Sequence, residues 1–105
     1  MIKVTYYVGT HDKDTCKREL LYSQFVKCFD ELFGNYTVQN AQGVYTMQDI
    51  ETVVKEFTFI VTTFIDDCTE VTLNQHVQYN CSILKDRLNQ ESILVEVTKP
   101  EVMFL

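Results

Sequence analysis

The residues from 52 to 64 read TVVKEFTFIVTTF, and this run constrains the fold more than any other part of the chain. β-Branched and aromatic residues dominate it, which is the composition of a strand rather than a helix. Side chains alternate between the two faces of a strand. Phe57, Phe59 and Val61 therefore share one face, while Ile60 and Phe64 share the other. Because both faces carry apolar side chains, the run predicts a strand in the middle of a sheet.

Three further strands and two helices are predicted around this run. The segments 2–8, 36–46 and 92–98 have strand composition, and Gly43 predicts a bulge or kink in the second of them. From 16 to 33, apolar residues recur at helical spacing in two series, which predicts a helix with a wide apolar face. A second helix carries a single apolar stripe. The stripe consists of Leu73, Val77, Cys81, Leu84 and Leu88.

Short oxygen-bearing side chains mark where the helices begin. Asp14 or Thr15 precedes the first helix, and Asp67 or Thr69 precedes the second, with a possible capping box from Thr72 onward. The order strand, helix, strand, strand, helix, strand predicts an α+β fold. The expected form is a ferredoxin-like βαββαβ two-layer sandwich, in which an antiparallel four-stranded sheet carries two helices on one face. Residues 1–105 have the size of a single ferredoxin-like domain.

The charge of the chain argues against nucleic acid as a direct partner. Its 15 acidic and 9 basic residues produce a formal net charge of −6, which repels phosphate backbones, so we expect no direct DNA binding. No apolar run approaches the ~20 residues of a membrane span, and the first residues lack the pattern of a signal peptide. The sequence therefore predicts a cytoplasmic protein of the host cell, with no membrane partner.

The residues that commonly bind metals do not form a recognisable site. The cysteines at positions 16, 28, 68 and 81 show no C-x-x-C spacing, so neither a zinc site nor a redox pair is predicted. The segment HDKDT offers His11, Asp12 and Asp14 as ligands. A calcium loop would need a glycine and a closing glutamate after them, and neither follows. We therefore expect no metal and no cofactor.

The segment KEFTFIV, residues 55–61, is similar to the strand that presents aromatic side chains to RNA in RNA-recognition domains. In those domains a glycine follows the basic residue, whereas Glu56 stands here, and the third aromatic position is not filled in register. The negative net charge also disfavours RNA. RNA binding by Phe57 and Phe59 through the sheet is therefore an alternative and not the main hypothesis.

The two apolar faces of the long strand also predict a dimer. If both helices cover one face, either Phe57 and Phe59 or Ile60 and Phe64 must lie on the uncovered face. Exposed apolar patches of this kind usually mark interfaces. These four residues are therefore the predicted face of a possible homodimer. The alternative is that a loop or the terminal VMFL run covers the face.

No catalytic residue is predicted from a motif. A cysteine and a histidine could form a nucleophilic pair. However, Cys81 belongs to the apolar stripe, and His76 lies one residue away from it, at its rim. If the protein is an enzyme, its substrate pocket is expected between the helices and the sheet, as in dimeric ferredoxin-like barrels. Tyr6, His11 and His76 are then the candidates.

Two acidic clusters flank the long strand, and they are the predicted partner-binding residues. They consist of Asp49, Glu51 and Glu56 near its beginning and of Asp66, Asp67 and Glu70 beyond its end. The clusters are expected at opposite ends of the sheet. Solvated surface charge is the simpler interpretation. The functional interpretation is a negative surface that competes with nucleic acid for a basic groove on another protein.

Three segments carry a resemblance to a known group of proteins. They read YYVGTHDKDT, AQGVYT and LNQESILVEV, and the most specific parts are residues 9–15, 42–46 and 88–94. The chain resembles a group of small uncharacterised proteins of bacteria and phages that are predicted to be ferredoxin-like. No activity is settled for that group, so no catalytic residue carries over. In size, acidity and lack of a catalytic motif, the chain is also similar to type II anti-CRISPR proteins as a class.

These observations lead to one main hypothesis and two alternatives. The main hypothesis is a non-enzymatic inhibitor from a phage or mobile element. It would bind a host nucleic-acid-handling effector with a basic groove, plausibly Cas9 or its guide-RNA assembly, through the acidic clusters. The alternatives are a small-molecule enzyme of the dimeric ferredoxin-like barrel type and an RNA-binding protein. The sequence favours a protein that is not an enzyme.

Overall fold

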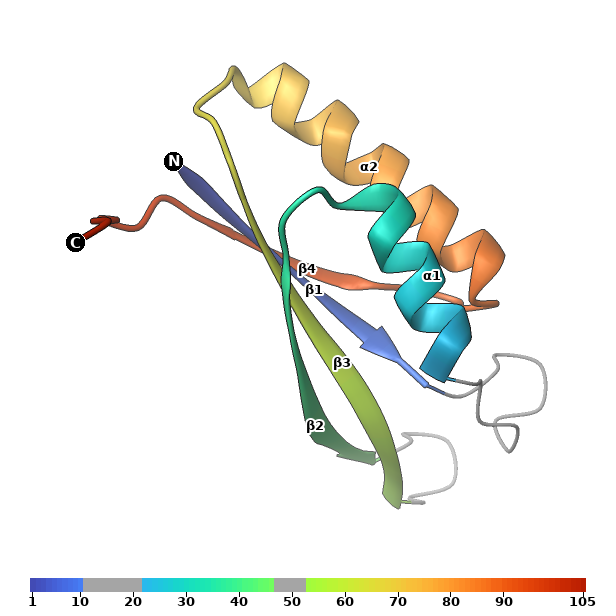
Figure 1. The fold of residues 1–105 in the computed structure, drawn as a ribbon. Coiled ribbons are helices and arrows are strands. Elements are labelled where there is room, and N and C mark those ends of the chain that lie inside the picture. The colour runs from blue at the N-terminus through green and yellow to red at the C-terminus, as the bar shows by residue number, and fades with distance from the viewer. Residues whose placement is uncertain (11–21, 47–52) are drawn as a thin grey trace.

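The structure is a computed structural model that describes residues 1–10, 22–46 and 53–105, without the side chains of 45–46 and 53–56. Its elements follow the predicted order. They are β1 (Ile2–Gly9), α1 (Tyr22–Leu32), β2 (Thr37–Thr46), β3 (Val53–Ile65), α2 (Glu70–Arg87) and β4 (Leu94–Thr98). The ferredoxin-like fold is therefore confirmed, with both helices on one side of the sheet (Figure 1).

The four strands form one antiparallel sheet in the order β2-β3-β1-β4. The first strand, β1, lies inside the sheet because it pairs with β3 on one side and with β4 on the other. β1 pairs with strands that are distant in the sequence. Ile2 is opposite Ile65, and Val4 is opposite both Thr63 and Val97. The sheet is therefore complete only when the last strand has paired.

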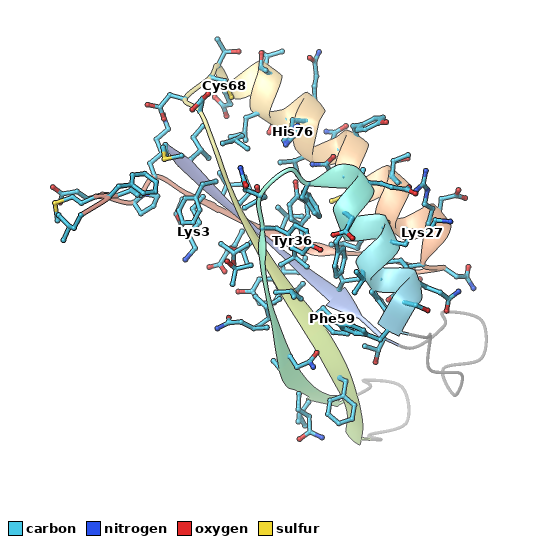
Figure 2. The ribbon with its side chains drawn as sticks, in the orientation of Figure 1. Lys3, Lys27, Tyr36, Phe59, Cys68 and His76 are labelled. Carbon is cyan, nitrogen blue, oxygen red and sulfur yellow. The ribbon has the colours of Figure 1, made fainter. Side chains whose placement is uncertain are left out.

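The core lies between the sheet and the helices. Alternate residues of β1 point into it, and Ile2, Val4, Tyr6 and Val8 are each 0% exposed. From β3, Phe59 meets α1, with its ring centroid 4.7 Å from that of Phe25 (Figure 2). Such tilted ring pairs combine a large buried area with favourable ring geometry.

One local prediction is confirmed, and others are wrong. Thr69 is the N-cap of α2, and its hydroxyl accepts a hydrogen bond from the amide of Thr72, so no capping box begins at Thr72. No bulge forms at Gly43, because β2 pairs with β3 without interruption along its whole length. The apolar face of α1 is narrower than predicted, since Tyr22 is 59% exposed.

Three free cysteines lie in the described segments, at Cys28, Cys68 and Cys81. Burial raises the pKa of the Cys28 and Cys81 thiols, an effect that Arg87 and Lys85 respectively oppose. Both side chains are thus held as neutral packing groups and not as thiolate nucleophiles. Cys28 and Cys81 therefore do not support a cysteine–histidine pair, and Cys16 and His11 lie outside the described residues. Within the same segments, no helix is both long enough and apolar enough to cross a membrane.

Candidate functional site

The sheet face opposite the helices, here called the open face, carries the most suggestive arrangement of side chains. Residues of β1 that alternate with its core residues point to this face, namely Lys3, Thr5 and Tyr7. Figure 2 shows Lys3 on the side of the sheet away from both helices. The strand register determines which residues of the other strands lie beside them.

A row of polar residues crosses the open face from one edge to the other. Glu96 of β4 is opposite Thr5 of β1, Thr5 is opposite Thr62 of β3, and Thr62 is opposite Thr37 of β2. Directly opposite residues of antiparallel strands point to the same face. These four residues, called the polar row below, therefore place three hydroxyls and one carboxylate in a line. Thr5, in the middle, is only 6% exposed.

A tyrosine holds the carboxylate at one end of the polar row. The Tyr7 hydroxyl donates a hydrogen bond to Glu96 Oε1 over 2.6 Å. This hydrogen bond is the main reason that the pKa of Tyr7 is raised, because ionising the phenol would remove the donated proton. The contact orients the carboxylate, which keeps further lone pairs for a ligand. Exposed Leu94, opposite Tyr7 in the register, provides an apolar neighbour.

The other end of the polar row leads into a cavity of about 390 Å³. The cavity lies where β2 begins and β3 ends. Its wall combines the two threonines at this end of the polar row with aromatic, amide and apolar side chains. The lining residues are Met1, Asn35, Tyr36, Thr37, Thr62, Phe64, Val102 and Phe104. A concave site with apolar walls and a few polar groups is the usual form of a small-molecule site.

Three interactions fix the wall of this cavity to the rest of the molecule. The Tyr36 hydroxyl donates a hydrogen bond to Asp30 Oδ1, and this bond raises the pKa of Tyr36 to about 12. The Tyr36 ring also packs against Phe29, with 6.0 Å between the ring centroids. The amino group of Met1 lies 3.2 Å from Asp67 Oδ1. The cavity therefore adjoins the core at Tyr36 and the chain terminus at Met1.

The enzyme candidates predicted from the sequence lie elsewhere, under α2. The Asn80 Nδ2 atom donates to the Tyr6 hydroxyl over 3.0 Å and lies 3.2 Å from His76 Nε2. The structure thus brings Tyr6 and His76 together through an amide, but Tyr6 is 0% exposed. Burial raises its pKa to about 12, and the Asn80 hydrogen bond opposes that shift. A substrate cannot reach the Tyr6 hydroxyl in this packing. His11 lies outside the described residues.

The predicted partner-binding acids are spread along the molecule. Asp66, Asp67 and Glu70 are exposed between the end of β3 and the first turn of α2. Glu56 lies near the beginning of β3, some ten residues away, which corresponds to roughly 33 Å along an extended strand. Asp49 and Glu51 lie outside the described residues. The expectation that the clusters lie at opposite ends of the sheet holds for the backbone of Glu56 and Asp66.

The structure shows which of the two aromatic and apolar pairs predicted for the dimer face lies on the uncovered face of the sheet. Ile60 and Phe64 lie on the open face, opposite Tyr7 and Lys3, and Phe64 is 43% exposed. Phe59 instead packs between β3 and α1, and it is 6% exposed. Phe57 shares the helix-side face of β3 with Phe59 but lies near the strand end, where it is 56% exposed. Phe57 and Phe59 are therefore not part of the open face.

This placement also argues against RNA binding by KEFTFIV. RNA-recognition domains stack bases on aromatic side chains of the uncovered sheet surface. Here Phe59 faces the helices and is buried against Phe25, so it offers no stacking surface.

Two other kinds of site, a metal site and a cavity between the helices, are less convincing than the open face. Within the described segments, no three histidine, cysteine, aspartate or glutamate side chains gather as a metal site would require. A second cavity, of about 370 Å³, lies between α1 and α2. Glu31 and Arg87 form an ion pair at its wall, and Lys27 and Cys28 also line it. The charges of Glu31 and Arg87 are thus paired with each other, so this cavity is a weaker candidate for a ligand site.

Comparisons with known proteins were made by sequence and by structure. No protein-family model and no curated protein sequence matches the chain. Among solved structures, a phage SAM lyase in complex with S-methyl-5'-thioadenosine matches with a TM-score of 0.74 and 20% sequence identity. The match covers 93% of this chain and 80% of that chain. The same lyase in its apo state matches with a TM-score of 0.72 and 20% identity, over 92% of this chain and 78% of that one.

CutA from Synechococcus elongatus PCC7942 has the same fold at greater distance. Its TM-score is 0.59 and its sequence identity 12%, over 94% of this chain and 75% of that chain. Such low identities establish the shared ferredoxin-like fold alone.

The inhibitor hypothesis is corrected by these comparisons. The solved structures with TM-scores of 0.74 and 0.72 are those of an enzyme, and neither they nor CutA support a similarity to anti-CRISPR proteins. The small-molecule enzyme alternative agrees better with this finding than the main hypothesis does.

Proposed function

We propose that this protein is a small-molecule enzyme that cleaves S-adenosylmethionine and releases S-methyl-5'-thioadenosine. One observation carries the proposal, namely the match to a phage SAM lyase over 93% of this chain with a TM-score of 0.74. The open face supports it independently of that match, because it offers a cavity of small-molecule size and an oriented carboxylate. The buried Tyr6 cluster is not the proposed site, because no substrate reaches it.

The proposed reaction balances without a cofactor. The bond between the sulfonium sulfur and the γ carbon of the methionine arm breaks, and its electron pair stays on sulfur. S-Methyl-5'-thioadenosine then leaves as a neutral thioether. The four-carbon fragment either closes onto its own carboxylate or loses a proton from its β carbon, and neither route consumes water. The positive charge on sulfur makes the leaving group good, so the corresponding neutral thioether should not react.

The test is direct incubation of the purified protein with S-adenosylmethionine. We expect S-methyl-5'-thioadenosine to accumulate, as measured by liquid chromatography and mass spectrometry, at a rate proportional to protein concentration. A sample without protein measures the spontaneous decomposition of the substrate. S-Adenosylhomocysteine, which is the matched neutral thioether, should remain intact in a parallel incubation.

The site is tested with the Glu96→Gln variant, which removes the charge on the open face. Glu96 is exposed, so the substitution should leave the fold intact. We expect the variant to release S-methyl-5'-thioadenosine at least about tenfold more slowly, a change equivalent to 1.4 kcal/mol in the barrier. Product formation no faster than the protein-free control in the unchanged protein would show that the proposed function is wrong.

A further inference from the structure

We infer that the polar row is one elongated ligand site with two chemically different ends, suited to a purine nucleoside that carries a positive charge. The inference rests on the proposed function for its choice of nucleoside, and it adds which residues recognise which part of the ligand. The cavity at Phe64 and Phe104 receives the base. Glu96, oriented by Tyr7, receives the cation.

The cavity end has the composition that a nucleobase requires. Besides Tyr36, which packs against the core, the aromatic rings of Phe64 and Phe104 line it, and flat heterocycles stack favourably on such rings. Phe104 is 87% exposed and Phe64 is 43% exposed, so their ring faces are not already used in the core. The Asn35 amide offers both a donor and an acceptor at the same wall. Stacking surface and amide edge are the two features by which proteins select a purine.

The carboxylate end has the charge that a cation requires. Glu96 is an exposed glutamate, and its carboxylate accepts the Tyr7 hydrogen bond over 2.6 Å. The side chains of Leu94 and Ile60 lie beside Tyr7 on the same face. A sulfonium group is a cation without N–H or O–H donors, so it is recognised by charge and apolar contact more than by hydrogen bonds.

The distance between the two ends fits one small molecule. Glu96 and Thr62 are separated by two strand spacings, which amounts to roughly 10 Å between their backbones. Thr5 lies between Glu96 and Thr62, which lines the cavity, and the two threonines lie where the hydroxyl groups of a ribose would lie. The chain has a net charge of −6, so its surface also attracts a cationic ligand over distance.

The experiment measures binding and does not depend on turnover. Two uncleaved probes with the same skeleton are compared by isothermal titration calorimetry. Sinefungin carries an amine on carbon at the place of the sulfonium, whereas S-adenosylhomocysteine has a neutral sulfur there. We expect Glu96→Gln to weaken sinefungin about tenfold, as loss of one charge-assisted contact does, and to change S-adenosylhomocysteine less than about threefold.

The other end is tested with Phe104→Ala, on a residue so exposed that the fold does not depend on it. This variant is expected to weaken both probes by about the same factor, roughly tenfold, because both carry adenine. Glu91→Gln is the matched control for charge removal, since Glu91 is an exposed glutamate outside the polar row. It should leave the affinity for both probes unchanged.

The outcomes separate this inference from the proposed function. If Glu96→Gln weakens both probes equally or neither, the two-ended site is wrong, even when the unchanged protein cleaves S-adenosylmethionine. If the unchanged protein cleaves nothing but Glu96→Gln selectively weakens sinefungin, the site stands and the proposed function falls. Unchanged affinity of both probes in Phe104→Ala also overturns the assignment of the base to the cavity.

Discussion

At the scale of single residues, the neighbouring tyrosines Tyr6 and Tyr7 lie in very different environments. Tyr6 lies under α2 with its ring centroid 5.2 Å from that of Phe33, and its hydroxyl accepts a hydrogen bond from the buried Asn80 amide. Tyr7, the next residue, points to the opposite face and donates to an exposed carboxylate. Because side chains alternate between the two faces of β1, the Tyr6 phenol is part of the core, whereas the Tyr7 phenol is available to ligands on the open face.

The buried phenol predicts a specific loss of stability at high pH. Its pKa is about 12 in the folded protein, against an ordinary value of 10.0, mainly because burial disfavours the charged form. The neutral phenol therefore stabilises the fold fully below pH 10, and this contribution is lost as the pH rises through 12. Two pH units correspond to about 2 to 3 kcal/mol.

Urea unfolding at several pH values from 8 to 12 measures this loss. We expect Tyr6→Phe, which has no proton to lose, to show an alkaline loss smaller than that of the unchanged protein by about 2 kcal/mol. Tyr79→Phe, on an exposed residue of α2, is the matched control and should behave as the unchanged protein does. An identical alkaline loss in Tyr6→Phe would contradict the assignment.

At the scale of the elements, α2 shows how local sequence determines where a helix begins and ends. Thr69 accepts from the amide of Thr72, and Glu70 lies in the first turn, where a negative charge complements the helix dipole. Lys85 and Arg87 lie in the last turn, where a positive charge is favourable. Asn89 has a positive φ of 47° just after the helix, a conformation that asparagine tolerates better than most residues.

The cap makes an element-scale prediction. Thr69→Ala removes the side-chain acceptor, so we expect the free energy of unfolding to fall by about 1 kcal/mol. Thr69→Ser keeps the hydroxyl and should stay within about 0.5 kcal/mol of the unchanged protein. Both values come from chemical denaturation at neutral pH. If the alanine variant were as stable as the serine variant, the cap would contribute nothing measurable.

Sequence patterns were sufficient for the elements but not for the site. Period-two alternation grouped Phe57 with Phe59 and Ile60 with Phe64, but it does not reveal which group faces the helices. That depends on how α1 lies on the sheet, which buries Phe59 against Phe25. The polar row was missed because Glu96, Thr5, Thr62 and Thr37 come from four strands. Only the strand register brings them together, and no local signal in the sequence encodes it.

At the scale of the whole molecule, the open face combines apolar and polar side chains. Phe64 and Leu94 are 43% and 67% exposed, and Phe104, which lines the same cavity as Phe64, is 87% exposed. The homodimer predicted from the sequence stays a prediction. Of its four predicted residues, Ile60 and Phe64 are the two that lie on the open face. Apolar surface that one chain leaves uncovered is most often covered by another.

Light scattering after size-exclusion chromatography tests the homodimer. We expect a mass of twice 12.3 kDa at high protein concentration. Phe64→Asp, which puts a charge on the open face, should restore the single-chain mass, whereas Asp86→Asn on the exposed surface of α2 should leave the double mass unchanged. A mass of 12.3 kDa for the unchanged protein at every concentration would show that the chain is a monomer. The probe titrations should use one concentration at which the mass is known.

The pairing of β1 has a consequence for how the protein is made. β1 leaves the ribosome before both of its partners, which are β3, where Ile2 is opposite Ile65, and β4, where Lys3 is opposite Thr98. During translation the apolar side chains of β1 therefore stay uncovered until β3 and β4 have also been synthesised. Nascent chains of this protein should therefore depend on chaperones that bind unfolded chains at the exit of the ribosomal tunnel. The same contacts between distant residues should make refolding slow.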